Sequence, residues 1–219
     1  MMCATNGSTV SRFETHALQV IRWEDERSVA DVLARAFVDD PLVKAICPGP
    51  TAERYRRIWW SFRMALRSHC LAKQPGWSIV DMNATPVAAV LATRSGSSIS
   101  SRGDFFFALR GLWHVGLATG LRGAQAAQTI AAHTPLQPFT YLRTIAVDPA
   151  VQRRGFGSQL VEWVVRGSPA SLPVYLETAK EQNLSFYERH GFTCVGDFRC
   201  LGVRVWRLLR LAKGPARVA

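Results

Sequence analysis

The chain has 219 residues and a mass of 24.3 kDa, which suits one domain and gives no reason to expect a second. It is 48% hydrophobic and 20% charged, with a mean hydropathy of +0.02, so intrinsic disorder and fibrous classes are excluded. The formal net charge is +11, and all but four of the 27 cationic residues are Arg. Since Arg matches phosphate and carboxylate geometry, a phosphorylated small molecule, a nucleic acid and an anionic membrane surface are all admissible partners.

The cysteines and the N-terminal residues indicate where the protein works. The five cysteines are scattered, without a CxxC pair or a histidine at zinc-finger spacing, so we expect a reducing compartment and no metal. Residues 1–23 lack the apolar run of a signal peptide, which predicts a cytoplasmic protein. The apolar stretch 105–121 is interrupted by Arg110 and His114 and is shorter than the roughly 20 residues of a membrane span, so we expect no membrane contact.

The first half of the chain alternates between strand and helix patterns. Residues 16–23 predict a strand, and a helical pattern from Glu24 to Phe37 stops before Pro41. A second helix is expected over about residues 52–71, with a cationic and an aromatic face. Residues 76–82 and 86–93 are two apolar runs separated by a turn, which predicts a hairpin.

Residues 101–132 form an insertion of helical character. Its apolar residues recur at intervals of three to four, the spacing of one helix face: Phe105, Leu109, Leu112, Trp113 and Leu117. We expect this face to pack on the domain core or on another subunit, and not on lipid.

A regular strand–helix–strand–helix order follows. Its members are expected at residues 139–147, 155–165, 174–177 and 181–190, and Gly191 closes the last helix. This order predicts a parallel strand pair with a right-handed crossover. Residues 192–200 and 203–209 can complete a mixed sheet, so the fold class is α/β.

The junction between the strand ending at Val147 and the next helix has the build of a phosphate-binding loop. Residues 147–158 have the sequence VDPAVQRRGFGS. Glycines let the backbone approach an anion closely, the helix start offers N–H groups, and Arg153 and Arg154 add forked donors. A Rossmann fingerprint would need a glycine where Leu160 stands, and the Walker Gly-Lys-Ser/Thr sequence is absent, so both of these motifs are excluded.

Three motifs in order resemble the GNAT superfamily of acyl-CoA-dependent N-acyltransferases. Gln152, Gly155 and Gly157 meet its pyrophosphate-binding pattern Gln/Arg-x-x-Gly-x-Gly/Ala. Residues 142–149 resemble its fourth strand, and residues 183–192 resemble its closing element with the Tyr-Glu pair. Residues 173–178 and 186–189 look like the branch that includes puromycin N-acetyltransferase, although we do not infer that substrate.

The resemblance implies the GNAT fold over residues 1–219: a mixed twisted sheet with splayed central parallel strands, flanked by helices, and with the 101–132 insertion covering the acceptor side or mediating homodimerisation. It implies acetyl-CoA as co-substrate, with pantetheine against the free strand edge, the pyrophosphate on the loop and a side chain at the next helix start, where an ordinary helix cap is the alternative role. The residues expected to bind acetyl-CoA are Ile145, Ala146, Val147, Gln152, Arg153, Arg154, Gly155, Phe156, Gly157, Ser158 and Asn183.

Two residues are candidates for proton transfer. The resemblance implies that Tyr187 protonates the departing CoA thiolate, whereas the alternative is a buried Tyr with a satisfied hydroxyl. Glu177 follows an apolar strand at the end where ligands collect in open α/β sheets, so it is a candidate base for the acceptor amine. A surface Glu beside Lys180 and a water relay are the alternatives. Asp39 and Asp40 could line the acceptor pocket or form a solvated turn.

The sequence therefore predicts acetyl transfer from acetyl-CoA to the primary amine of a small molecule. A protein N-terminus or lysine is the alternative acceptor, and a catalytically silent CoA sensor is a third interpretation. A basic nucleic-acid-binding module is less favoured, because no known motif accompanies the arginines that support it. These are Arg54, Arg56, Arg57, Arg63 and Arg67.

Overall fold

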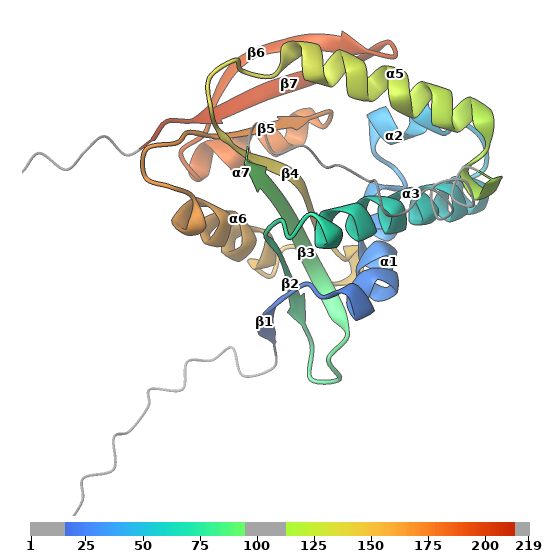
Figure 1. Cartoon of the computed structure of the whole chain (residues 1–219), viewed down its shortest axis with the longest axis horizontal. Helices are drawn as coiled ribbons and strands as arrows, with labels where there is room; N and C mark the ends of the chain where they lie inside the picture. The colour runs from blue at the N-terminus through green and yellow to red at the C-terminus, as the bar shows by residue number, and fades with distance from the viewer. Residues whose placement is uncertain (1–15, 95–112, 213–219) are drawn as a thin grey trace, which may run out of the picture.

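The computed structural model describes residues 16–94 and 113–212, which form a seven-stranded mixed sheet flanked by helices (Figure 1). The strand order is β1-β2-β3-β4-β5-β7-β6. Neighbouring strands are antiparallel except for β4 and β5, which are parallel, so the predicted mixed α/β sheet is confirmed. The strands are β1 (Ala17–Val20), β2 (Gly76–Val80), β3 (Pro86–Arg94), β4 (Thr140–Val147), β5 (Val174–Thr178), β6 (Thr193–Cys200) and β7 (Val203–Arg210).

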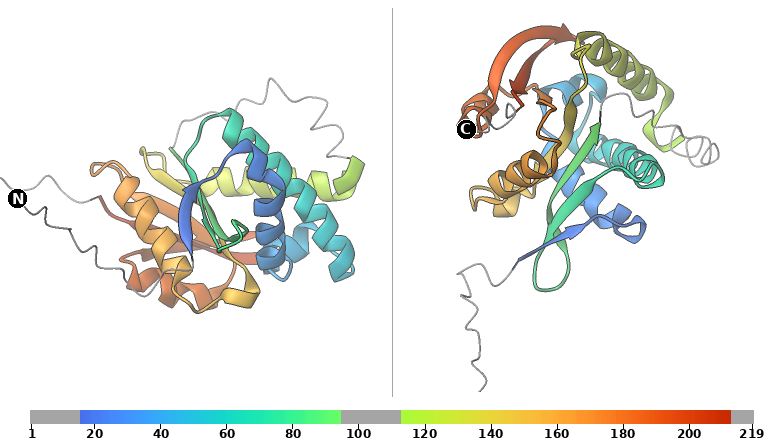
Figure 2. Two further views of the ribbon diagram at one scale, coloured as in Figure 1. Left: turned by 90° about the horizontal axis from the view of Figure 1, so that it is seen from below. Right: turned by 60° about the vertical axis from the view of Figure 1, so that its left-hand side comes forward.

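The helices cover both faces of this sheet. Helices α6 and α7 lie on one face, α1 and α3 lie on the other, and α5 runs along β6 and β7 (Figure 2). The α-helices are α1 (Glu26–Phe37), α2 (Pro41–Ile46), α3 (Thr51–Leu71), α5 (Leu117–His133), α6 (Phe156–Gly167) and α7 (Leu184–Arg189). Three short 3-10 helices are η1 (Trp23–Asp25), η2 (Pro149–Val151) and η3 (Glu181–Asn183).

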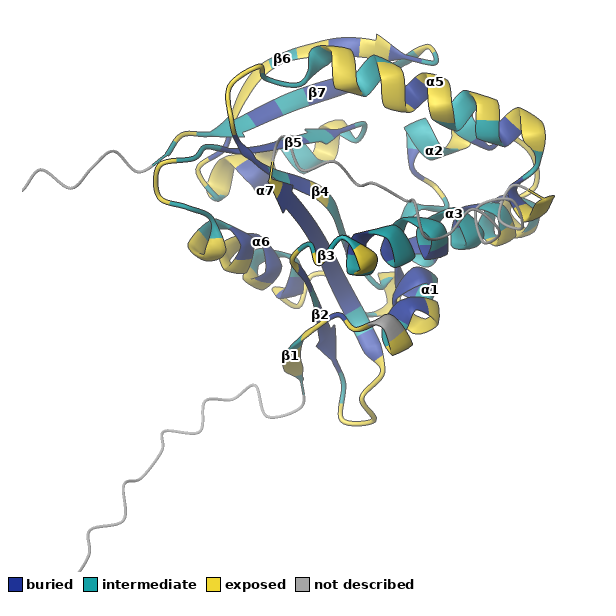
Figure 3. Cartoon of the chain, viewed as in Figure 1, coloured by how far each residue is buried: buried dark blue, intermediate teal, exposed yellow. Residues whose placement is uncertain are grey.

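Strand β3 separates two hydrophobic clusters and is buried along most of its length (Figure 3). Successive side chains of a strand point to opposite faces. Accordingly, Ala88 and Val90 pack in the cluster with α6 and α7, whereas Ala89 and Leu91 pack in the cluster with α1 and α3. Burial on both faces explains why residues 86–93 form a continuous apolar run in the sequence.

The structure corrects the sequence prediction around residues 16–46. Strand β1 is shorter than the predicted 16–23, and α1 begins at Glu26 after η1. The prediction missed α2, although its start signals are present: the Asp40 carboxylate accepts hydrogen bonds from the backbone N–H of Leu42 (2.9 Å) and Val43 (3.2 Å), and Pro41 is the first helical residue. Asp40 is only 7% exposed, so it caps a helix and does not belong to a solvated turn.

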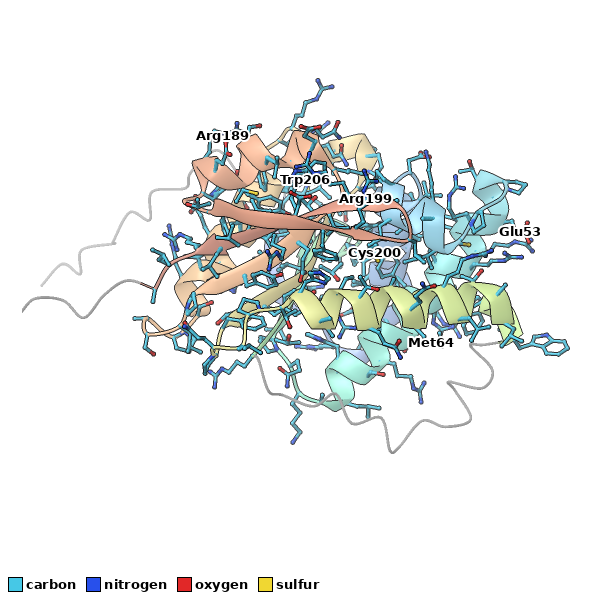
Figure 4. All side chains as sticks on the ribbon, turned by 90° about the horizontal axis from the view of Figure 1, so that it is seen from above. Glu53, Met64, Arg189, Arg199, Cys200 and Trp206 are labelled. Atoms are coloured by element: carbon cyan, nitrogen blue, oxygen red, sulfur yellow. The ribbon has the colours of Figure 1, made fainter. Side chains whose placement is uncertain are left out.

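Within the described residues, the insertion packs on the domain through α5. Helix α5 lies beside β6 and β7 (Figure 4). Ala126 on α5 packs in one cluster with Phe198, Cys200 and Val205. Trp113 and Leu117 are 87% and 67% exposed, and the remaining members of the predicted face, residues 105, 109 and 112, lie outside the described residues. Within the described ranges, no helix combines the length and apolar character needed to cross a membrane.

Two of the arginines that supported the nucleic-acid interpretation are buried by internal contacts. Arg63 pairs with the buried Glu26, and its guanidinium lies over the rings of Trp59 (4.9 Å) and Trp60 (4.8 Å). Arg54 is 6% exposed and donates to the carbonyls of nearby loops at 2.7 and 2.8 Å. These side chains are therefore withdrawn from the surface that a nucleic acid would contact.

Candidate active site

Strands β4 and β5 separate soon after they begin to pair. Their register contains only two pairs, Thr140 with Val174 and Tyr141 with Tyr175. On its other edge, β4 pairs with β3. There Leu142 lies opposite Ala92 and Thr144 lies opposite Leu91, so Arg143 between them is an extra residue without a partner on β3. Such a bulge bends the strand that contains it. The bend comes two residues after the last β4–β5 pair, and it gives the splayed central strands that were predicted.

The ladder with β3 decides which backbone groups of β4 face this gap. The Asp148 N–H donates to the Val87 carbonyl at 2.9 Å, and hydrogen-bonded pairs alternate along an antiparallel ladder. Ala146 lies opposite Ala89 and two residues before Asp148, so it is also in a hydrogen-bonded pair and its N–H points to β3. The N–H groups of Ile145 and Val147 therefore point to the β5 side. Of the three β4 residues predicted to bind pantetheine, only Ile145 and Val147 have a backbone N–H available, because the Ala146 N–H is already used within the sheet.

The phosphate-binding loop ends at Gly155, the residue before α6. Gly155 has a φ of +87°, a conformation in which residues with a side chain are strained, and a Cβ added here would meet no atom within 4 Å. No side chain caps α6, and the Gln159 N–H makes an intrahelical bond to Gly155 at 3.1 Å. The preceding N–H groups, those of Phe156, Gly157 and Ser158, are left for a ligand or water, so the positive end of α6 faces open space.

The polar residues of the loop are exposed around that helix end. Gln152, Arg153 and Arg154 are all exposed, and Arg153 adopts a φ of +64°. The amide nitrogen of Gln152 donates to the Val147 carbonyl at 3.1 Å and so ties the loop to the end of β4. Backbone donors, a helix dipole and two guanidinium groups are the features that hold a phosphate.

Gly157 serves packing, in contrast to Gly155. A Cβ at this position would lie 3.4 Å from the Phe186 ring and 3.8 Å from a methyl group of Val147. The glycine therefore lets the first turn of α6 approach both α7 and β4. Phe156 is buried in the same core, and Ser158 Oγ lies 3.0 Å from His190 Nε2 beyond the end of α7.

Tyr187 is 5% exposed and belongs to the cluster between α6, α7 and the sheet. Its ring makes edge contacts with Phe186 and Phe192, with centroids 5.1 and 5.8 Å apart. Burial raises the pKa of the Tyr187 phenol well above its ordinary value, so it holds its proton. The neutral phenol therefore has a proton to donate.

Asn183 does not act as the helix cap that was one of its predicted roles. Its side chain makes no cap bond to α7, and its amide nitrogen instead donates to Thr178 Oγ1 at 3.2 Å. Thr178 is the last residue of β5. Asn183 therefore stands beside the carboxyl end of β5, at the rim of the gap.

Glu177 is half-buried, and its carboxylate faces the tyrosine rings of β4 and β5 instead of standing on an exposed surface. The Tyr141 hydroxyl donates to Glu177 Oε2 at 2.7 Å, while Oε1 is buried with no hydrogen-bond partner among the described residues. Burial raises the pKa of Glu177 above its ordinary value, and the hydrogen bond from Tyr141 partly opposes that rise. A carboxylate with a free oxygen and a raised pKa suits the removal of a proton from an amine.

The groups around Glu177 were not predicted from the sequence. Tyr175 lies two residues before Glu177 on the same face of β5, a periodicity that could have been read from the sequence. Tyr141 and Arg207 reach Glu177 only through strand pairing, since β4 pairs with β5 at Tyr141 and β7 places Arg207 opposite Glu177. Burial raises the pKa of both tyrosines, so their phenols are neutral donors.

The two proton-transfer candidates lie on opposite faces of the sheet. Leu176 packs in the cluster that contains Tyr187, so the next residue, Glu177, points to the other face. The gap between β4 and β5 is where the two faces meet. Among the described residues there is no group of three or more His, Cys, Asp or Glu side chains placed to hold a metal ion.

The comparisons with known proteins agree with this geometry. The model of the acetyltransferase (GNAT) domain matches residues 103–194. A structure described as histone acetyltransferase HPA2 and related acetyltransferase from Corynebacterium glutamicum is 20% identical, with a TM-score of 0.70 over 92% of this chain and 99% of that chain.

Two other similar structures are a small-molecule acetyltransferase and a peptide-bound complex. The polyamine N-acetyltransferase of Drosophila melanogaster is 14% identical, with a TM-score of 0.54 over 89% of this chain and 98% of its own. A chain of the NatC complex bound to Gag peptide and CoA is 13% identical, with a TM-score of 0.52 over 90% and 98%. At these identities the structures show the shared fold alone. The domain match indicates an acetyltransferase enzyme, and the structures agree with the GNAT fold.

Proposed function

We propose that this enzyme transfers an acetyl group from acetyl-CoA to the primary amine of a small molecule. The observation that carries the proposal is the open edge of β4, which begins after Tyr141 and leads to the positive end of α6. An unpaired strand edge inside a domain is costly unless a ligand pairs with it, and pantetheine supplies the amide groups to do so. When bound, acetyl-CoA supplies the activated acetyl thioester.

The residues of the chain divide the work of binding. The N–H of Ile145 pairs with pantetheine, and the N–H of Val147 polarises the thioester carbonyl and stabilises the charge that develops on its oxygen. The N–H groups at the start of α6, with Arg153 and Arg154, hold the pyrophosphate. The side-chain oxygen of Asn183 remains available to the CoA arm, because its nitrogen is bonded to Thr178.

Glu177 and Tyr187 carry the two proton transfers. The acceptor arrives as an ammonium, and Glu177 Oε1 takes one proton so that the amine nitrogen can attack the carbonyl carbon. The new C–N bond forms as the C–S bond breaks, and Tyr187 donates its proton to the departing sulfur, which leaves as the CoA thiol. The new amide nitrogen gives its second proton to solvent water, and the Tyr187 phenolate regains a proton from water. Placement on opposite faces suits this division, because the acceptor and CoA then approach the gap from different sides.

The surroundings of Glu177 favour a small amine over a polypeptide acceptor. Its carboxylate is buried beside the rings of Tyr141 and Tyr175, and these two rings lie 6.0 Å apart. A primary amine on an apolar body can donate to the unpartnered Oε1 while its body contacts the aromatic rings. The resemblance to the puromycin N-acetyltransferase branch stays a prediction, and so do cytoplasmic location and homodimerisation.

The test is acetyl-CoA turnover, followed by the release of free thiol, with a panel of amines. The panel contains arylalkylamines, polyamines, an aminonucleoside, a peptide with a free N-terminus and an N-blocked peptide with one lysine. We expect turnover with at least one small amine and none with the peptides. Turnover with peptides alone would overturn the small-molecule assignment, and tight CoA binding without any turnover would favour a CoA sensor.

A further inference from the structure

An ion pair joins α1 to the residue that begins the phosphate-binding loop. Asp148 follows β4 directly, and its Oδ1 accepts a hydrogen bond from the Ala150 N–H at 3.0 Å, which caps η2. Its Oδ2 accepts from Arg35 Nε at 2.9 Å and from Arg35 Nη2 at 2.7 Å. One oxygen therefore shapes the turn locally, and the other fixes the turn to a helix 113 residues away in sequence.

Arg35 is itself held in place by two further groups. Asp31, one turn earlier on α1, forms an ion pair with Arg35, and the Tyr55 hydroxyl of α3 donates to Asp31. The result is a continuous connection from α3 through α1 to the end of β4. A side chain with this many partners keeps one orientation, which is what a positioning group requires.

The location of the pair argues against a role in stability alone. The side chains of Arg35 and Asp148 are 39% and 16% exposed, and partly exposed ion pairs contribute little to folding. The charge of Asp148, in contrast, matters to an anionic ligand. It stands four residues before Gln152, and an unpaired carboxylate there would oppose phosphate binding.

We propose that Arg35 is a positioning residue for acetyl-CoA, which orients the turn before the phosphate-binding loop and neutralises Asp148. This inference rests on the proposed function only in taking residues 152–158 as the pyrophosphate site. It assigns to α1, which contributes no residue to the loop, a part in the affinity for CoA. Arg35 acts through Asp148 and touches no reacting atom.

The test compares Arg35→Met, which keeps the apolar stem, with Arg204→Met as a matched control. Arg204 also donates from two nitrogens to one carboxylate: its Nε and Nη2 lie 2.9 and 3.0 Å from the two oxygens of Asp197. Arg204 lies on β7, however, and not next to the phosphate-binding loop. We expect Arg35→Met to weaken CoA binding by calorimetry about five- to tenfold and to raise the KM for acetyl-CoA with kcat near the wild-type value. The control should change neither quantity.

Two further measurements separate the possible results. Hydrogen exchange without ligand should be faster at the backbone amides of residues 150–158 in Arg35→Met and unchanged in Arg204→Met. The double variant Arg35→Met/Asp148→Asn should recover part of the lost affinity, because the unpaired charge is gone. Unchanged loop exchange, or equal losses of affinity in both Met variants, would overturn the inference. If the wild type itself fails to bind CoA, the proposed function falls, whereas a tight wild type with an equally tight Arg35→Met removes only this inference.

Discussion

Tyr141 donates a hydrogen bond of 2.7 Å to Glu177, and the bond spans the place where β4 and β5 part. It occupies one carboxylate oxygen and leaves the other free. Since a hydrogen bond to a carboxylate favours its charged form, Tyr141 works against the burial that raises the pKa of Glu177. The pair thus sets the pH at which the proposed base becomes able to accept a proton.

Tyr141→Phe should move the acidic limb of the kcat/KM profile to higher pH. The substitution removes a bond that lowers the pKa of Glu177, while Arg207 and Tyr175, the other groups facing it, remain. Glu177 then becomes ionised only at a higher pH, so activity at low pH is lost first. In Glu177→Gln the limb should disappear. A limb that stays in place in Tyr141→Phe would show that Glu177 is not the base.

Tyr187→Phe should lower kcat by about 10²-fold, the scale for the loss of a positioned proton donor. The ring and its contacts with Phe186 and Phe192 are kept, so KM for acetyl-CoA and the thermal midpoint should change little. Steady-state kinetics with a saturating amine measures the effect. Unchanged turnover would remove Tyr187 from the mechanism.

Gly155→Val should abolish CoA binding, because its side chain would occupy the space before α6 that the pyrophosphate needs. Gly155→Ala is the milder variant: its Cβ meets no protein atom, so the loss comes from the strained φ of +87° and the blocked space. Gly167→Ala is the matched control, since it lies at the other end of α6, also has free space, and has no left-handed φ. Calorimetry with CoA compares the three. Normal binding by a folded Gly155→Val protein would contradict the loop assignment.

Arg63→Met should destabilise the fold by about 3 kcal/mol, because it leaves the Glu26 carboxylate buried without its partner. Arg56→Met, at an exposed position of the same helix, should change stability by less than about 0.5 kcal/mol. Urea unfolding measures both. Equal stability of the two variants would mean that the Glu26–Arg63 pair contributes nothing to joining α1 and α3.

The sequence determined the elements whose signals are local. Helix α6 was predicted from its apolar spacing, and its phosphate-binding start was predicted from Gly155 and Gly157, because dihedral freedom and helix periodicity belong to short segments. The strands β2, β3, β4 and β5 were predicted from short apolar runs, which are also local signals. Helix α2 has equally local signals in Asp40 and Pro41. It was missed because these two residues end the helical pattern before them in the sequence and also begin the next helix.

Only the tertiary structure decided which distant residues meet. The bulge at Arg143 opens the gap, and strand pairing brings Tyr141 and Arg207 to Glu177. The contact of Arg35 with Asp148 likewise depends on how α1 packs on the sheet. A one-residue change of strand register would turn Tyr141, Glu177 or Arg207 to the other face of the sheet. Register is set by the summed packing of whole strands and helices, and no local motif in the sequence records it.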